Sequence, residues 1–391
     1  MGGEVMKFTP LEVLAVALRN PTGISFPHRR NDMKIPVSCG FACLGILLSG
    51  PVGVAQASYT IFASGLENPR GLAFSPEGVL YVAEAGTGGS SFTTSDQCLQ
   101  VPFPIGPYTA GLTSRISKID ANGTQTIVSD GLPSDETNPA SGGFLSGIAD
   151  VAFIGNRLYA LSSGGGCSHG LAGTYNGVFQ VVDGSLIPIA NLSAFQQANP
   201  VVNPEPDDFE PDGTWFSMVS HGDALYAIEP NHGELDEISA KGEITRISDI
   251  SASQGHIVPT SVVFHDGNFY FGNLWHFPIE PGSSNVYRLN PRTGDITIVA
   301  SGFTTIEGID FDNRGNLYVL ESMTLPGFPT PAEAGSGKIT RVSRSGDKDT
   351  VLTGLSFPTA MMFGPDGKLY VSNLGFAAPP GAGQILKVDV Q

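Results

Sequence analysis

The sequence predicts an all-β fold, a six-bladed β-propeller built from four-stranded blades. One observation is a repeated pair, an apolar or aromatic residue followed by Tyr, which occurs six times at the start of an alternating apolar and polar segment. A second is the short turn rich in Gly, Asp or Asn that precedes each pair, as in a β-hairpin. Repeats of four short strands are typical of propeller blades. The pairs are Leu80-Tyr81, Leu158-Tyr159, Leu225-Tyr226, Phe269-Tyr270, Leu317-Tyr318 and Leu369-Tyr370.

The clearest repeat is the segment Glu307–Leu355, in which all four strands of a blade can be identified. The expected strands are Gly308–Phe311, Leu317–Leu320, Lys338–Val342 and Thr350–Leu352. Polar turns connect the first strand to the second and the third to the fourth, and a Gly- and Pro-rich loop connects the second to the third. The other repeats follow the same order, so we expect one large domain.

The two ends of the propeller predict how its ring closes. The last repeat stops after its third strand, Gln384–Val388, and the propeller begins with a spare fourth strand, Tyr59–Leu66. This N-terminal strand can complete the sixth blade, which would remove open sheet edges that promote aggregation. We therefore expect the ring to be closed by the N-terminal strand.

Residues 33–57 have the features of a secretory signal peptide. Basic residues precede the apolar run Cys39–Val54, and Ala55-Gln56-Ala57 follows it. The run is short for a membrane span, so we expect cleavage after Ala57, and an uncleaved anchor is the alternative. Residues 1–32 form an unassigned extension, and residues 58–391 form the propeller. The expected location is periplasmic or extracellular, with no membrane span in the mature chain.

The charge of the chain narrows the class of partner. The formal net charge is −17 at pH 7, and an acidic chain without a Lys/Arg stripe argues against nucleic acids and anionic membranes. It permits cations, neutral sugars and aromatic ligands. We expect a monomer whose partner is a small-molecule ligand or another exported protein.

Two cysteines remain after the predicted cleavage. Cys98 and Cys167 lie in the long loops of the first and second blades. In an exported protein such a pair is more often bridged than free. Because the two blades are adjacent and the loops share a face, we predict a disulfide between them.

The long loops are all expected on one face of the propeller. They connect second strands to third strands and one blade to the next, whereas the other connections are tight turns. Loops on a rigid scaffold commonly carry function, so we place the site on this loop face. The polar residues expected there, at the ends of the second strands, are Glu84, Ser162, Glu229, Asn273, Glu321 and Asn373.

These strand-end residues have two interpretations. Short polar side chains at strand ends commonly cap loop amides. Alternatively, the six residues form a collar of oxygen ligands at the tunnel mouth. In that case Glu84, Glu229 and Glu321 would bind a divalent cation, Ca²⁺ rather than zinc because all the ligands are oxygens.

A second calcium site is possible in an acidic loop. Asp208, Glu210 and Asp212 repeat the spacing of the first ligands of a calcium-binding loop, although Val219 stands where that loop has its closing Glu. A solvated acidic loop is the simpler interpretation.

Aromatic and histidine side chains add ligand-binding candidates. His232, Trp275 and His276 follow the second strands of the third and fourth blades. Neither they nor His169 show the spacing of a zinc site, so we expect the histidines to be exposed in loops. The chain has no nucleophile elbow, P-loop or dinucleotide motif, so no catalytic residue is assigned.

Several segments resemble the ScyD/ScyE family, exported propellers related to NHL-repeat proteins and named from the cyanobacterial scytonemin pigment cluster. The resemblance covers most of residues 58–391 and implies the fold and an exported location. The segments are Asn203-Pro204-Glu205 to Asp212-Gly213, Leu225-Tyr226-Ala227, Asn231-His232-Gly233, Pro259-Thr260-Ser261 to Phe269-Tyr270-Phe271-Gly272-Asn273, Phe277-Pro278, Pro281-Gly282 and Leu317-Tyr318-Val319-Leu320-Glu321.

The six-bladed shape also resembles the gluconolactonase (SMP-30) propellers. That resemblance implies a divalent metal held by Glu, Asn and Asp near the starts of the first strands. Of the residues at these starts, Glu307 and Asp150 suit a metal. The six residues are Arg70, Asp150, Ser217, Thr260, Glu307 and Thr359.

Three functions remain open from the sequence. The first is an exported propeller of the ScyD/ScyE type that binds a small aromatic or polyhydroxy ligand, or is an accessory factor in secondary-metabolite or envelope chemistry. The second is a metal-dependent hydrolase or oxidative enzyme with a tunnel-mouth cation, and the third is a protein-interaction scaffold. The ligand-binding candidates are Glu84, Glu229, Asn273, Glu321, Asn373, Glu307, His232, Trp275 and His276.

Overall fold

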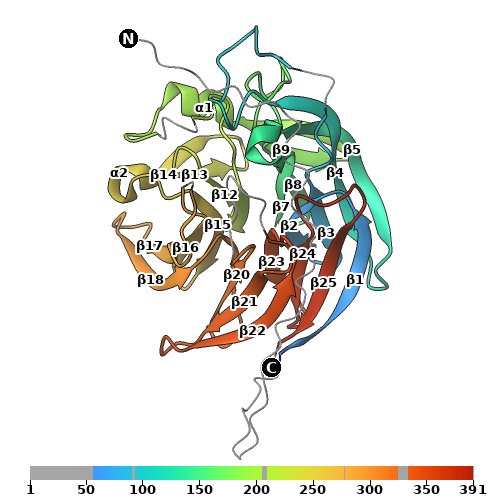
Figure 1. Cartoon of the computed structure of the whole chain (residues 1–391), viewed down its shortest axis with the longest axis vertical. Helices are drawn as coiled ribbons and strands as arrows, with labels where there is room; N and C mark the ends of the chain where they lie inside the picture. Colours follow the sequence, from blue (N-terminus) through green and yellow to red (C-terminus); the bar gives the residue numbers. More distant parts are fainter. Residues whose placement is uncertain (1–55, 90–92, 205–208, 277, 325–332, 391) are drawn as a thin grey trace, which may run out of the picture. The chain divides into compact units, whose positions relative to one another are not determined.

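Six antiparallel sheets follow one another along the chain, and each is one blade of a six-bladed β-propeller (Figure 1). The predicted all-β fold class is therefore confirmed. In this computed structural model the described residues are 56–89, 93–204, 209–276, 278–324 and 333–390. They belong to one unit, Val54–Gln391. The signal peptide predicted at residues 33–57 lies almost entirely outside the described residues.

Each blade runs from an inner first strand to an outer fourth strand. The first three blades contain β2 (Pro69–Phe74), β3 (Leu80–Glu84), β4 (Thr109–Ile119), β5 (Gln125–Glu136) and β6 (Leu145–Ser146); β7 (Ile148–Ile154), β8 (Arg157–Ser162), β9 (Gly177–Val182) and β10 (Ser185–Asn191); and β11 (Ser217–His221), β12 (Ala224–Glu229), β13 (Glu234–Ser239) and β14 (Ile244–Asp249). The last three contain β15 (Pro259–His265), β16 (Asn268–Asn273), β17 (Ser284–Leu289) and β18 (Ile296–Phe303); β19 (Ile306–Phe311), β20 (Leu317–Glu321), β21 (Gly337–Val342) and β22 (Lys348–Leu355); and β23 (Ala360–Phe363), β24 (Leu369–Asn373), β25 (Gly383–Asp389) and β1 (Ser58–Leu66).

The ring closes as the sequence predicted. The N-terminal strand β1 pairs antiparallel with β25, with Tyr59 opposite Val388 and Ile61 opposite Leu386. In Figure 1 the blue β1 lies beside the red β25. The sixth sheet therefore has the order β1-β25-β24-β23, in which the first strand of the chain completes the last blade.

The first blade carries one strand more than expected. Its fourth strand β5 is 12 residues long and extends past the other strands of the blade into the connection to the second blade. There β6 pairs with it, with Asp135 opposite Ser146. The extra strand places Leu145 and Ser146 at the wall of the central tunnel.

The Tyr of the repeated pair packs between neighbouring blades, which explains why it recurs. In four blades its ring packs edge-on against a Phe at the end of the first strand of the next blade, a favourable aromatic geometry. The contacts join Tyr81 to Phe153, Tyr270 to Phe311, Tyr318 to Phe363 and Tyr370 to Phe74, with centroids 4.9–5.2 Å apart. Each such Tyr therefore helps to join two blades.

Two short helices begin the loops between blades. Helix α1 (Leu192–Ala198) follows β10, and α2 (Ile250–Gln254) follows β14. Each begins where the preceding strand ends, because the side chains of Asn191 and Asp249 accept hydrogen bonds from the amides of Ala194 and Ala252. In the described part of the chain no helix is long and apolar enough to cross a membrane.

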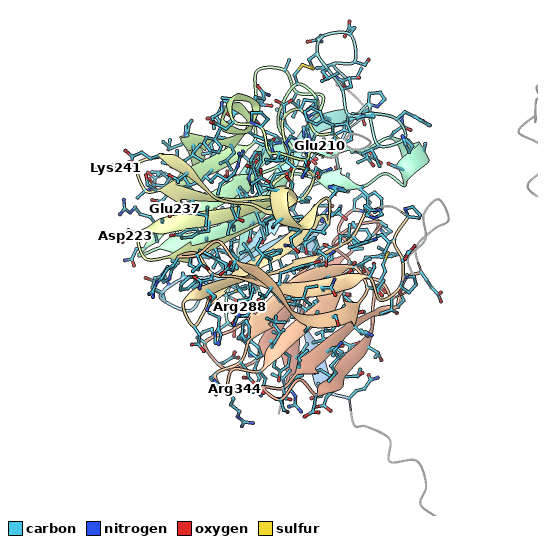
Figure 2. The ribbon with its side chains drawn as sticks, turned by 90° about the vertical axis from the view of Figure 1, so that its left-hand side faces the viewer. Glu210, Asp223, Glu237, Lys241, Arg288 and Arg344 are labelled. Carbon is cyan, nitrogen blue, oxygen red and sulfur yellow. A yellow bond between two sulfur atoms is a disulfide. The ribbon has the colours of Figure 1, made fainter. Side chains whose placement is uncertain are left out.

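The tight turns and the long loops lie on opposite faces. In Figure 2 the turn residues Asp223 and Lys241 lie at one side of the sheets, and Glu210, from a loop between blades, lies toward the other. On the loop face a disulfide joins Cys98 to Cys167, as predicted. The hydroxyl of Thr94 also donates to the carbonyl of Cys167, so the loops of the first two blades are joined twice.

Deleting residues 58–66 should destabilise the protein, because the edge of β25 would lose its partner and buried Leu66 would be removed. We expect a lower midpoint of thermal unfolding and increased light scattering. The matched control begins at Gln56 and keeps β1. If the two variants unfold at the same temperature and stay equally soluble, β1 does not close the ring.

Replacing both Cys98 and Cys167 by Ser should lower the free energy of unfolding by roughly 2–4 kcal/mol, because the unfolded chain is no longer restricted by the bridge. The native protein, alkylated without reductant, should show no adducts at these positions by intact mass. Two adducts on correctly exported protein would contradict the bridge.

Candidate functional site

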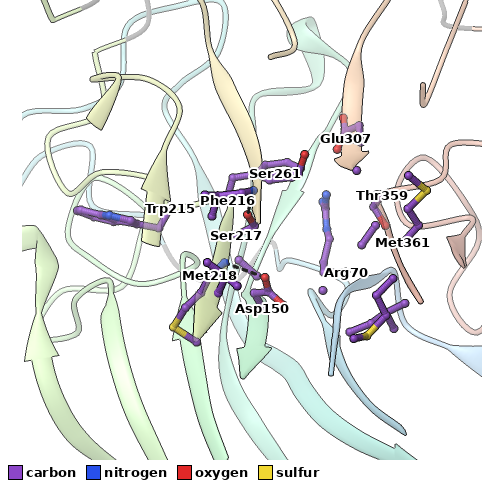
Figure 3. Close-up of a pocket in the computed structure, with 18 of the residues that line it drawn as sticks. Arg70, Asp150, Trp215, Phe216, Ser217, Met218, Ser261, Glu307, Thr359 and Met361 are labelled. Carbon is purple, nitrogen blue, oxygen red and sulfur yellow. Dashed lines mark hydrogen bonds between the residues drawn. The ribbon is translucent and has the colours of Figure 1, made fainter. Parts of the chain in front are cut away.

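A cavity of about 280 Å³ lies in the central tunnel (Figure 3). The first strands of all six blades contribute to its wall. Its apolar surface includes Leu72, Phe216, Met218, Val262, Ile309 and Met361. The polar side chains in its wall include Arg70, Asp150, Ser217, Ser261, Glu307 and Thr359. Concave sites that combine an apolar wall with a few polar groups are typical of small-molecule binding.

Several hydroxyl groups near the tunnel serve to join neighbouring blades. Thr359 donates to the carbonyl oxygen of Pro69 over 2.6 Å, and Thr260 donates to that of Ile306 over 2.6 Å. The hydroxyl of Ser217 accepts a hydrogen bond from the amide of Val262 at 2.8 Å. These side chains therefore already form hydrogen bonds between neighbouring blades.

The carboxylates of Asp150 and Asp310 also join blades. Asp150 accepts from its neighbouring amide in β7 and from the amide of Met218 in the next blade, at 2.8 Å each. Asp310 accepts in the same way from the amide of Phe363, at 2.7 Å. Burial raises the pKa of Asp150 to about 7 and the pKa of Asp310 to about 6, although these amides favour the charged forms.

Some polar groups of the cavity wall do not join blades. Among the described residues, the hydroxyl of Ser261 and atom Oε2 of Glu307 are buried without a hydrogen-bond partner. Burial raises the pKa of the Glu307 carboxyl to about 8, against the opposing effects of Arg70 and the hydroxyl of Ser322. Arg70 extends toward Glu307 in Figure 3, and its guanidinium donates a hydrogen bond to the carbonyl oxygen of Leu145.

The strand-end residues lie elsewhere, in contacts with loop backbone. Four of them accept a hydrogen bond from an amide in the segment that leads into their own blade, at 2.6–3.0 Å. The amides are those of Glu67 for Glu84, Thr214 for Glu229, Thr304 for Glu321 and Ser356 for Asn373. The side chain of Asn273 donates to the carbonyl of Ile257 and accepts from the amide of Asn285, whereas the hydroxyl of Ser162 has no hydrogen-bond partner among the described residues. These bonds match the interpretation as caps of loop amides.

The three glutamates of the expected collar have different partners. Glu84 forms a salt bridge with Arg115 at 2.8 Å, and Glu321 forms one with Lys338 at 3.2 Å. Glu229 accepts from two backbone amides, and burial raises its pKa to about 7. Within the described residues no group of three or more His, Cys, Asp or Glu side chains is arranged to hold a metal ion.

The acidic loop proposed for calcium is only partly visible, because Asp208 lies outside the described residues. Asp212 accepts hydrogen bonds from the amide and the hydroxyl of Ser168, at 2.8 and 2.7 Å. Glu210 is buried and accepts a hydrogen bond from the hydroxyl of Tyr108. Both carboxylates therefore connect this loop to loops of the first two blades.

The expectation that His169 is exposed was wrong. Its imidazole is fully buried, 2.7 Å from Asp135 through Nδ1 and 3.2 Å from Glu210 through Nε2. Burial disfavours the charged imidazole, but the two carboxylates outweigh it and hold the pKa of His169 well above its usual value. This buried charge cluster joins β5 of the first blade, a loop of the second and the loop that precedes the third.

Of the other loop histidines, His232 also differs from the expectation, whereas His276 agrees with it. His232 is buried, and its Nε2 lies 2.9 Å from the carbonyl oxygen of Glu210. Trp275 is half-buried and His276 is exposed, with ring centroids 4.9 Å apart. None of the three is among the residues that line the described part of the tunnel cavity. Of the ligand-binding candidates predicted from the sequence, Glu307 lines the cavity.

The comparisons with known proteins identify the fold. No family model matches the chain, and no curated protein matches it. Among solved structures, a protein described as an oxidoreductase (glucose dehydrogenase) from Thermus thermophilus matches with a TM-score of 0.52 and 15% identity, over 85% of this chain and 100% of that one. A gluconolactonase from Xanthomonas campestris matches with a TM-score of 0.50 and 11% identity, over 85% and 90%.

A luciferin-regenerating enzyme is similar to the same extent, with a TM-score of 0.50 and 11% identity over 85% of this chain and 96% of that one. At such low identities these neighbours show that the chain shares their propeller fold. They do not assign a ligand or a reaction to it.

The raised pKa values predict that the protein is more stable at about pH 5 than at about pH 8. Unfolded carboxyls titrate near pH 4, so between these pH values the folded Glu307 and Asp150 hold protons that the unfolded chain has lost. The free energy of unfolding therefore falls as pH rises. Glu307 alone should contribute a few kcal/mol, since one pKa unit corresponds to about 1.4 kcal/mol.

Thermal unfolding measured across this range tests the prediction. Glu307→Gln should flatten the pH dependence, whereas Glu237→Gln, in the turn-side region of Figure 2, should leave it unchanged. A wild-type midpoint that rises steadily toward pH 8 would show that these carboxyls are not protonated in the folded protein.

Proposed function

We propose that this protein is an exported β-propeller of the ScyD/ScyE type that binds a small aromatic or hydroxylated molecule in its central tunnel. The main support is the cavity of about 280 Å³, with its apolar wall and few polar groups. Ser261 and Glu307 each leave one buried polar atom without a partner in the described part of the chain. Leaving a buried polar atom without a hydrogen bond lowers the stability of the protein by about 1–3 kcal/mol. Hydrogen bonds to a ligand would offset this loss.

The location and wider role rest on the sequence. The predicted signal peptide and the ScyD/ScyE resemblance support export, and a disulfide is compatible with an oxidising compartment. The same resemblance supports an accessory role in secondary-metabolite or envelope chemistry. The rigid tunnel wall, joined by bonds such as that from Thr359 to Pro69, favours a preformed binding site.

The two tryptophans allow a direct test. Trp215 lies in the wall of the cavity, whereas Trp275 lies on a loop, so Trp275→Phe leaves one fluorescent reporter at the tunnel. We expect members of a panel of hydroxylated and aromatic small molecules to change the emission of Trp215 in a saturable way.

Ala360→Phe is the matched blocking variant, because Ala360 lines the cavity at the start of β23 and a larger side chain there would fill it. We expect at least a tenfold loss of affinity with little change in thermal unfolding. If ligands bind this variant as tightly as the wild type, they bind outside the tunnel and the proposal fails.

A further inference from the structure

The tunnel contains a guanidinium group that has no salt bridge among the described residues. Arg70 is half-buried and lines the cavity. Glu307 and Asp135 attract it, yet within the described residues neither forms a salt bridge with it. Its guanidinium instead donates a hydrogen bond to the backbone carbonyl of Leu145. An unpaired charge in a desolvated site is costly, so this position favours an anion.

The neighbouring carboxyls do not neutralise that charge well. Burial raises the pKa of Glu307 to about 8, so this carboxyl tends to hold a proton near neutral pH. Asp135 already pairs with His169, 2.7 Å away. A protonated Glu307 can donate a hydrogen bond as well as accept one. The polar part of the cavity then combines one cation with neutral hydrogen-bonding groups.

We propose that the tunnel ligand is a small carboxylic acid whose carboxylate pairs with Arg70; this inference rests on the proposed function and names its class of ligand. The planar guanidinium can donate two parallel hydrogen bonds to a carboxylate. A hydroxyl group elsewhere on the ligand would bond to Ser261 or Glu307, which have unpartnered polar atoms in the described structure. The apolar body would pack against Met218 and Met361, whose flexible side chains adapt to its shape.

The size and charge of the cavity narrow the class further. A volume of about 280 Å³ lies just below the usual range of small-molecule sites, about 300–1,000 Å³, which suits a small ligand. One arginine suits a monoanion better than a phosphate ester, which carries more charge and needs more donors. The apolar wall favours an aromatic or branched aliphatic acid.

Isothermal titration calorimetry with 4-hydroxybenzoate and its neutral amide, 4-hydroxybenzamide, tests this inference. In the wild-type protein we expect the acid to bind at least tenfold more tightly than the amide. Arg70→Gln should abolish the preference, and Arg70→Lys should keep part of it because it keeps the charge. Arg344→Gln, which changes an exposed turn residue, should behave as the wild type.

The outcomes separate this inference from the proposed function. If acid and amide bind equally well and Ala360→Phe abolishes both, the tunnel binds small molecules but not as carboxylates, and the inference is overturned. If neither probe binds and no member of the fluorescence panel does, both proposals fail. If Arg70→Gln does not fold, Arg70→Lys decides, since unchanged affinity for the acid and for the amide would show that the guanidinium does not hold the ligand.

Discussion

The pairing of β1 with β25 is the interaction on which the rest of the structure depends. Closing the ring brings β23 beside β2, where Thr359 donates to the carbonyl of Pro69 and Ser372 donates to that of Arg70. These bonds fix the strand that carries Arg70 against a blade at the far end of the sequence. A propeller without this closure would have an open edge, and its first strands would not enclose a common cavity.

The same requirement explains which polar atoms are left for a ligand. Most polar side chains around the tunnel bond to the next blade, as Asp150 does to the amide of Met218. The strand-end residues such as Glu229 hold the loops in a similar way. The groups that remain at the cavity include the guanidinium of Arg70 and the unpartnered atoms of Ser261 and Glu307 in the described chain. The candidate site is therefore defined by the polar groups that the ring does not use.

The sequence predicts the fold better than the site for physical reasons. Blades repeat because each must pack against the next in the same way, and the contact of Tyr318 with Phe363 makes that repetition visible as a sequence pair. The site has no such repeat, because Arg70 and Ser261 each belong to a single blade. The strands that carry them resemble ordinary core strands in sequence. The burial of His169 was unpredictable for a related reason, because it depends on Asp135 and Glu210 from separate blades and loops.

We expect the ligand to bind in the tunnel beside Arg70 and Glu307, and not on the loop face. A crystal structure of the protein with 4-hydroxybenzoate would locate the ligand. We expect the carboxylate within hydrogen-bonding distance of the Arg70 guanidinium and the ring against Met361, with the propeller unchanged. A ligand bound only among the long loops, with ordered water alone in the tunnel, would contradict it.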